Sequence, residues 1–75
     1  MVKHKEKVSV LGLGYIGLPT AAILADKGFM VFGVDVNAEV VETVNNGNIH
    51  IIEPGLEKLV RSSIESESLI ASTKP

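Results

Sequence analysis

Two short runs of apolar residues in the first half of the chain predict two strands of a parallel sheet. Residues 8–11 (Val-Ser-Val-Leu) form a β-branched run that ends at a glycine, which is typical of a buried strand. Residues 29–34 (Phe-Met-Val-Phe-Gly-Val) are apolar without interruption and are followed by Asp35. A continuous apolar run, rather than an alternating one, indicates burial on both faces, as in parallel sheets.

Between these two runs, the sequence predicts a helix over residues 16–27. The segment is rich in alanine and in large apolar side chains, enough for about three helical turns. Pro19 falls in the first turn, where a missing N–H has no intrahelical partner to lose. Gly28 follows directly and suits the left-handed position after the last turn. The first half of the chain is therefore predicted to be strand, helix, strand.

The second half of the chain predicts two more helices and one more strand. Asn37 is a favourable N-cap for a short helix that ends at Asn46 and Gly47. Pro54 supplies the start of a third helix. Apolar positions repeat at helical spacing in both, namely Val40, Val41 and Val44 in the second helix and Leu56, Leu59, Val60 and Ile64 in the third. Residues 69–73 (Leu-Ile-Ala-Ser-Thr) predict a last short strand.

The predicted order is β-α-β-α-α-β, which belongs to the α/β class. Strands that alternate with helices over so short a span favour parallel pairing through right-handed crossovers. A complete doubly wound dinucleotide-binding domain has about six strands. The pattern therefore predicts the first half of a Rossmann-type doubly wound parallel sheet, a fragment of a larger domain.

Length and composition exclude several classes of function. The chain has 75 residues, of which 45% are hydrophobic, with no cysteine and a formal net charge of −2. A disulfide framework, a thiolate zinc site and a cysteine nucleophile are thus excluded within it. Its 7 basic and 9 acidic side chains provide no broad cationic surface. We therefore do not expect nucleic acid as a partner.

Glycines also argue against a membrane segment. The longest nearly uncharged stretch, residues 8–25, is interrupted by Gly12, Gly14, Gly17 and Pro19. It is too short and too broken for a membrane span. The same interruptions are foreign to the unbroken apolar core of a signal peptide. We expect no membrane association and a cytoplasmic location.

The candidate chemistry lies in residues 12–17, Gly-Leu-Gly-Tyr-Ile-Gly. In this spacing Gly12 allows a tight turn after the strand, and Gly14 lets the backbone approach a pyrophosphate without a Cβ clash. Gly17 permits close packing of the helix against the strand. A glycine turn without a ligand is the alternative interpretation. The preceding strand and the following helix favour dinucleotide binding.

Tyr15 and Ile16 stand at the predicted start of the helix. Their N–H groups are expected to face the phosphates, whose charge the positive end of the helix dipole favours. Tyr15 is the sole tyrosine, but the pyrophosphate turn lies far from the nicotinamide. Packing or cover of the cofactor is therefore a simpler role for its side chain than proton transfer. We predict no catalytic residue and no metal site in this chain.

Asp35 is the candidate ribose acceptor. It ends the second strand 18 residues after Gly17, where a carboxylate accepts hydrogen bonds from the adenosine ribose. A carboxylate would repel a 2′-phosphate, and neither Val36 nor Asn37 offers a cation, so NAD is favoured over NADP. FAD and S-adenosylmethionine proteins place a carboxylate similarly and stay open at this point. A local hydrogen-bonding role at the helix entry is the simpler alternative.

Three other polar residues have simple structural explanations. His50 lies between isoleucines, where a packed or surface-loop histidine is the default and a contact to substrate or a neighbouring domain the alternative. Glu53 precedes Pro54 and suits a helix start. His4 stands among lysines in a solvated tail. We assign no chemistry to these positions.

Four blocks in order resemble the N-terminus of the UDP-glucose/GDP-mannose dehydrogenase family. They are GLGYIGLPTAA at residues 12–22, GVDVN at 33–37, GNIHIIEPGL at 47–56 and LIAST at 69–73. Residues 49–54 are most similar to the subgroup that oxidises UDP-N-acetyl-D-mannosamine. The resemblance extends from residue 8 to the end of the chain but covers only about the first fifth of such proteins.

The resemblance implies an enzyme that oxidises the C6 alcohol of a UDP-sugar to a carboxylate with two NAD, for surface polysaccharide. It implies NAD contacts at Gly12, Gly14, Tyr15, Ile16, Gly17 and Asp35. Catalysis in the family uses a downstream cysteine, with a lysine, an asparagine and an aspartate, so this segment alone should be inactive. UDP-glucose is the alternative substrate. A non-catalytic regulatory module that senses NAD is the alternative of another class.

The expected domain organisation follows from these observations. Residues 1–7 form a polar N-terminal lead-in, and residues 8–75 the N-terminal part of an NAD-binding domain, without the dimerisation and substrate domains. The UDP-sugar partner would bind through those downstream domains, in a homo-oligomer. A half sheet exposes an apolar strand edge, so we predict that the isolated segment associates with itself or folds poorly.

Overall fold

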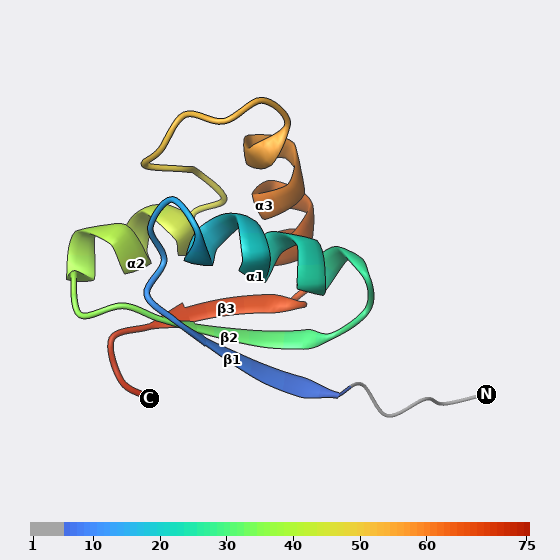
Figure 1. Cartoon of the computed structure of the whole chain (residues 1–75), viewed down its shortest axis with the longest axis horizontal. Helices are drawn as coiled ribbons and strands as arrows, with labels where there is room; N and C mark the ends of the chain where they lie inside the picture. Colours follow the sequence, from blue (N-terminus) through green and yellow to red (C-terminus); the bar gives the residue numbers. More distant parts are fainter. Residues whose placement is uncertain (1–5) are drawn as a thin grey trace.

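The computed structural model describes residues 6–75, which form a three-stranded sheet and three helices (Figure 1). The elements in chain order are β1 (Lys7–Leu11), α1 (Gly17–Asp26), β2 (Met30–Val34), α2 (Ala38–Asn45), α3 (Leu56–Glu65) and β3 (Leu69–Ser72). This order confirms the predicted β-α-β-α-α-β arrangement and the α/β class. The expected lead-in lies largely outside the described residues, as does His4.

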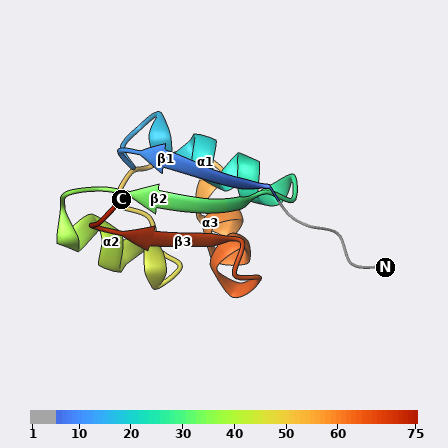
Figure 2. The ribbon, with the colours of Figure 1, turned by 90° about the horizontal axis from the view of Figure 1, so that it is seen from below.

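The sheet is parallel throughout, with the strand order β1-β2-β3. Val10 is level with Gly33, and Gly33 with Ala71, so the strands run in step and end at one edge. All three helices cover the same face (Figure 1). Figure 2 shows the opposite face, which no helix of residues 6–75 covers. Leu11 and Ile70 are exposed, and they follow Val10 and Leu69, which face the core, along their strands, so they lie on this open face.

The core lies between the sheet and the helices. Val31 and Leu69 face it from the strands, while Val44 and Val60 face it from α2 and α3. Each of these side chains is almost completely buried, and burying one such side chain contributes about 1.5–3 kcal/mol. The predicted apolar stripes on the helices are therefore confirmed as core. Together they bury one face of the half sheet.

Asn45 closes the outer edge of β3. Its side-chain Oδ1 accepts the N–H of Ala71, and its Nδ2 donates to the carbonyl oxygen of Ala71, both at 2.9 Å. These are the two backbone groups with which a further strand would pair. β1, at the other side of the sheet, has no such cover among the described residues. The two edges of the sheet therefore differ.

Two predicted element boundaries shift because of backbone hydrogen bonds. Lys7, expected in the polar lead-in, is the first residue of β1 because it is level with Met30 in the ladder. Phe29, expected as the start of β2, instead lies in the turn that follows α1. Its N–H donates to the carbonyl of Leu24 while Gly28, at φ 102°, turns left-handed. This pair of features is the Schellman helix ending.

The third helix also begins later than predicted. Pro54 was the expected start, but α3 begins at Leu56 after Gly55, whose φ of 82° is left-handed and cannot belong to a helix. Pro54 lies instead in a turn that the Leu56 N–H closes onto the Glu53 carbonyl. The other boundaries differ from the predicted ones by one residue, at Ile16, Lys27 and Thr73.

Candidate cofactor site

The glycine motif folds into the turn between β1 and α1, at the carboxyl edge of the sheet. Gly12 takes a φ of 90°, and its N–H donates to the Val34 carbonyl at 2.7 Å, which fastens the turn to β2. A Cβ on Gly17 would overlap the Gly12 carbonyl oxygen. The helix start and the turn therefore touch backbone to backbone, and only glycine fits at position 17.

Gly14 and the two residues after it lie on the open side of this turn. A Cβ on Gly14 would meet no atom within 4 Å, so the space above the turn is free. Tyr15 and Ile16 are 73% and 83% exposed, which is unusual for large apolar side chains. The backbone can thus be approached closely by a ligand.

The start of α1 leaves backbone donors without partners. Ile16 is the N-cap but provides no side-chain hydrogen bond, and the first turn holds no acidic residue. Within residues 6–75, the N–H groups of Tyr15 and Ile16 donate to no other group. Open donors at the positive end of a helix dipole bind anions such as phosphates. The turn therefore fits the pyrophosphate of a dinucleotide.

Leu13 joins the glycine turn to β2 and to Asp35, and the sequence analysis did not identify this role. Its side chain is completely buried and lies where a Cβ of Gly33 would stand, with its Cδ2 at 2.8 Å from that position. Its N–H donates to Asp35 Oδ2 at 2.9 Å. The sequence signal for this contact was Gly33, a glycine inside an otherwise apolar strand, which leaves room for the side chain of Leu13.

Asp35 lies at the end of β2 and is held by two backbone donors. Oδ2 accepts the Leu13 N–H and Oδ1 accepts the Asn37 N–H, each at 2.9 Å. These hydrogen bonds, in that order, lower the pKa of the Asp35 carboxyl below its ordinary value of 3.8, and the charge of His50 lowers it further. The carboxylate is therefore ionised at neutral pH. Each oxygen keeps a lone pair for a further donor.

The structure brings the six predicted site residues together at one edge of the sheet. Asp35 is bonded to the glycine turn through Leu13, and Gly12 is bonded to β2 through Val34. A shallow hollow of about 280 Å³ lies at this edge, lined by Leu11, Gly12, Val34, Asp35 and Val36. The local hydrogen bond from Asn37, weighed as the simpler role of Asp35, is also present. This hydrogen bond is compatible with the ribose role, because each oxygen of the Asp35 carboxylate keeps a lone pair that can accept a ribose hydroxyl.

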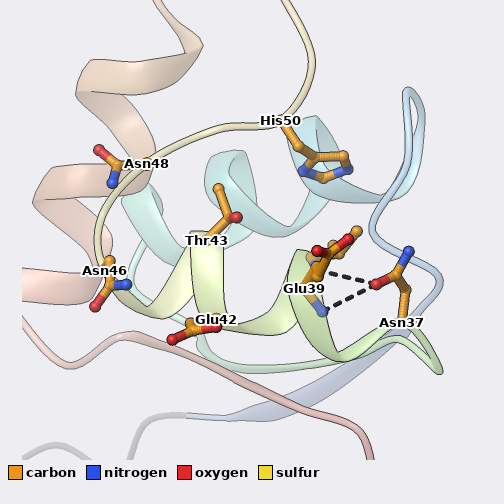
Figure 3. A pocket seen from close by; sticks show the side chains of 8 residues that line it. Asn37, Glu39, Glu42, Thr43, Asn46, Asn48 and His50 are labelled. Carbon is orange, nitrogen blue, oxygen red and sulfur yellow. Dashed lines mark hydrogen bonds between the residues drawn. The ribbon is translucent and has the colours of Figure 1, made fainter.

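A second and larger depression, which we name the α2 hollow, adjoins this site (Figure 3). It measures about 420 Å³ and is lined by Asn37, Glu39, Val40, Glu42, Thr43 and Asn46 of α2 and its caps, with Asn48 and His50 of the following loop. In Figure 3, His50 lies at the same end as Asn37 and Glu39. His50 is exposed, in agreement with the predicted loop position.

Two further properties of residues 6–75 bear on the kind of site. None of their helices is long and apolar enough to cross a bilayer. No group of three or more acidic, histidine or cysteine side chains among them is arranged to hold a metal ion. The chemical groups of this site are therefore a glycine turn, an open helix start and an ionised carboxylate.

These features define a Rossmann-type dinucleotide-binding unit. A family model described as "UDP-glucose/GDP-mannose dehydrogenase family, NAD binding domain" matches residues 6–75. The chain belongs to this family, and its cofactor is NAD. The resemblance noted in the sequence is thereby confirmed.

Individual relatives of this family match nearly the whole of this chain. The chain is 59% identical over 70 residues to the UDP-N-acetyl-D-mannosamine dehydrogenase of Yersinia pestis, covering 93% of this chain and 17% of that protein. It is 53% identical over 68 residues to the NDP-N-acetyl-D-galactosaminuronic acid dehydrogenase of Ralstonia nicotianae, covering 91% of this chain and 16% of that protein. The chain thus spans about a sixth of these relatives.

Solved structures agree with this assignment. The native structure of the UDP-N-acetyl-mannosamine dehydrogenase of Staphylococcus aureus superposes with a TM-score of 0.90 at 44% identity, over 93% of this chain and 17% of that one. A ternary complex of GDP-mannose dehydrogenase from Pseudomonas aeruginosa gives 0.88 at 37% identity, over 89% and 15%. The predicted half-Rossmann fold, a fragment of a larger domain, is confirmed.

Proposed function

We propose that the protein bearing this segment is an NAD-dependent 6-dehydrogenase of UDP-N-acetylmannosamine. It forms UDP-N-acetylmannosaminuronate with two NAD, in the cytoplasm, for surface polysaccharide. The identity of most of the chain to UDP-N-acetyl-D-mannosamine dehydrogenases supports this substrate. Support for the cofactor role comes from the glycine turn with its open helix start beside Asp35. This last observation carries the proposal.

In this proposal different residues bind different parts of the cofactor, and the glycine turn with the start of α1 binds its pyrophosphate. Gly12 and Gly14 let the backbone approach the pyrophosphate, and Gly17 keeps the helix start against the turn. The N–H groups of Tyr15 and Ile16 bind phosphate oxygens. They can do so because no side chain caps this helix start.

The ribose end of the cofactor falls to Asp35. Its ionised carboxylate accepts the hydroxyls of the adenosine ribose and repels a 2′-phosphate. The Leu13 and Asn37 N–H groups fix the orientation of this carboxylate before the cofactor arrives. Bound NAD supplies the hydride acceptor. The residues of this segment bind and orient it and transfer no proton.

The same proposal assigns the remaining chemistry to other parts of the protein. The family's catalytic cysteine has no counterpart among these 75 residues, which contain none. Residues 8–75 are the incomplete N-terminal part of the NAD-binding domain, so the segment alone is inactive. The UDP-sugar binds through downstream domains, in a homo-oligomer.

An activity assay on the intact purified protein tests this function. We expect NADH to form with NAD and UDP-N-acetylmannosamine, at two NADH per sugar, and little turnover with UDP-glucose or with NADP. A higher kcat/KM for UDP-glucose would replace the substrate but keep the class. NAD binding without turnover on any UDP-sugar would overturn the enzyme in favour of the regulatory module. Residues 1–75 alone should bind no UDP-sugar and form no NADH.

A further inference from the structure

The asparagines of the chain, Asn37, Asn45, Asn46 and Asn48, differ in what their side chains do. Asn37 caps α2 and Asn45 covers the edge of β3, so both of their side-chain amides are in use. Within residues 6–75, the side-chain amides of Asn46 and Asn48 make no hydrogen bond, and both residues are exposed. Asn46 lines the α2 hollow and lies apart from the capped start of α2 (Figure 3). Asn46 and Asn48 therefore carry amides that are open to reaction.

The residue that follows each of these two amides separates them. Asn46 is followed by Gly47, which has no side chain to hinder the approach of its backbone nitrogen to the Asn46 side chain. Asn48 is followed by Ile49, whose branched Cβ crowds the same approach. Asn46 is therefore the asparagine whose side-chain amide a backbone nitrogen can attack most readily.

The ending of α2 holds this pair in a closed conformation. Asn46 has a ψ of 4°, and the Gly47 N–H donates to the carbonyl of Val44 at 2.9 Å. The Asn48 N–H donates to the carbonyl of Thr43 at 3.0 Å, while Gly47 turns left-handed at φ 80°. Together these features are a Schellman ending. Because the Gly47 nitrogen is engaged in it, a reaction of this nitrogen requires the ending to open.

A small opening is enough. The two hydrogen bonds that close the ending lie at the last turn of a helix of 8 residues, where helices fray. Asn45, directly before the pair, remains fixed to Ala71 by two bonds at 2.9 Å. Residues 46–48 can therefore open while α2 stays packed on the sheet. Two hydrogen bonds of ordinary net strength reduce the open population roughly ten- to a hundredfold, which slows a reaction at this site without preventing it.

We propose that Asn46 is a site of spontaneous deamidation, with water as the co-reactant. The Gly47 nitrogen loses its proton to water and attacks Asn46 Cγ. The bond between Cγ and the side-chain nitrogen then breaks, and this nitrogen takes up a proton from water and leaves as ammonia, so that a cyclic imide remains. Water adds to one of the two imide carbonyls and the ring C–N bond breaks. The product is aspartate or isoaspartate at position 46.

The product changes the end of α2 in two ways. The new carboxylate lies at the negative end of the helix dipole, in a hollow that Glu42 also lines, and both effects are unfavourable. In isoaspartate the main chain also gains a methylene group, so the bonds of Gly47 and Asn48 no longer form in register. Deamidation therefore converts the closed ending into an open one, directly beside the amide of Asn45 that covers β3.

Peptide mapping of the intact protein by mass spectrometry, after ageing at mildly alkaline pH, tests this inference. We expect acid to form at Asn46 about tenfold faster than at Asn48, and isoaspartyl methyltransferase to label the same peptide. Asn37 and Asn45 should stay intact because their amides are bonded. In guanidinium chloride the ending is open, so the reaction at Asn46 should be roughly ten- to a hundredfold faster.

Asn46→Gln is the matched control. It keeps an amide at this position, but its longer side chain must close a larger ring, so formation of acid there should stop. A native rate at Asn46 no higher than that at Asn48 would overturn the inference. So would a native Asn46 that stays intact while the denatured protein reacts. The measurement involves neither NAD nor a sugar, so its outcome and that of the activity assay are independent.

Discussion

The starts of α1 and α2 show two opposite treatments of the same structural problem. Every helix begins with N–H groups that have no partner within the helix. At α2, Asn37 Oδ1 accepts the N–H groups of Glu39 at 2.9 Å and Val40 at 3.4 Å. At α1, Ile16 provides no side-chain acceptor, and no acidic residue stands in the first turn. The N–H groups at the start of α2 are therefore capped by a side chain of the chain itself, whereas those at the start of α1 are left without an acceptor.

The difference teaches where a ligand is expected. At α2 the cap and the Glu39 carboxylate complement the dipole, so the helix needs nothing from outside. At α1 the donors can be satisfied only by water or by an anion. Both helices follow a strand of the same parallel sheet. The composition of the two connecting turns therefore separates a binding helix from a structural one.

The largest effect is expected where the open start touches the turn. In Gly17→Ala the new Cβ overlaps the Gly12 carbonyl oxygen and lies 2.8 Å from its carbon, and backbone atoms cannot rotate away. The turn must open, which should lower the free energy of unfolding by about 3 kcal/mol. Displaced donors should weaken NAD binding on the order of 100-fold. Thermal unfolding and calorimetric titration of the intact protein measure the two effects.

Gly14→Ala is the matched control for that variant. Its Cβ meets no protein atom within 4 Å, so the melting temperature should not change. The same Cβ stands on the approach to the pyrophosphate, and NAD binding should fall by about tenfold, which is about 1.4 kcal/mol. A stable variant with wild-type affinity would show that the cofactor does not lie over this turn.

At the closed start the expected effect falls on stability. Asn37→Ala removes the acceptor of the Glu39 and Val40 N–H groups and should lower the free energy of unfolding by about 1 kcal/mol. Asn37→Asp retains an acceptor and should remain within a few tenths of a kcal/mol of wild type. Thermal unfolding of both variants decides. Equal losses in the two would mean that the cap is not the stabilising contact.

The smallest effect is a pH dependence at Asp35, which links the two starts through its bonds to Leu13 and Asn37. The pKa of this carboxyl is lower in the folded protein than its ordinary 3.8. The ionised form therefore stabilises the fold above pH 3.8, and this contribution is lost as the pH falls through the lowered pKa. Asp35→Asn should flatten the fall in melting temperature between about pH 5 and pH 3. If the melting temperatures of the wild type and of Asp35→Asn fall in parallel with pH, this contribution of Asp35 is contradicted.

The fold was predictable to the extent that local patterns decide it. All six elements follow from apolar runs, glycines and the Asn37 cap, because each signal lies within a few residues of the element that it defines. Boundaries failed where backbone geometry decides instead. Gly55 turns left-handed and delays α3, and the Schellman bond of Phe29 delays β2. Hydrophobic spacing indicates neither the left-handed conformation of Gly55 nor the hydrogen bond of Phe29.

The candidate site was predictable as a motif but not as a set of contacts. Spacing alone placed the glycines and Asp35 at one edge of the sheet. The bond from the Leu13 N–H to Asp35 and the seat of the Leu13 side chain over Gly33 join residues distant in sequence. His50 likewise approaches Asp35 only through the path of the loop after α2. Such contacts depend on tertiary packing, which no local pattern records.

The amide of Asn45 gives the sheet a direction of growth. By occupying both backbone groups of Ala71, it acts as a terminator that imitates the next strand at the β3 side. Among the described residues, β1 has no substitute of this kind along its outer edge. An incoming strand, whether from the same polypeptide or from a neighbour, would therefore pair more readily beside β1 than at the Ala71 position of β3. A single amide side chain thus makes the two edges of the half sheet unequal as pairing surfaces.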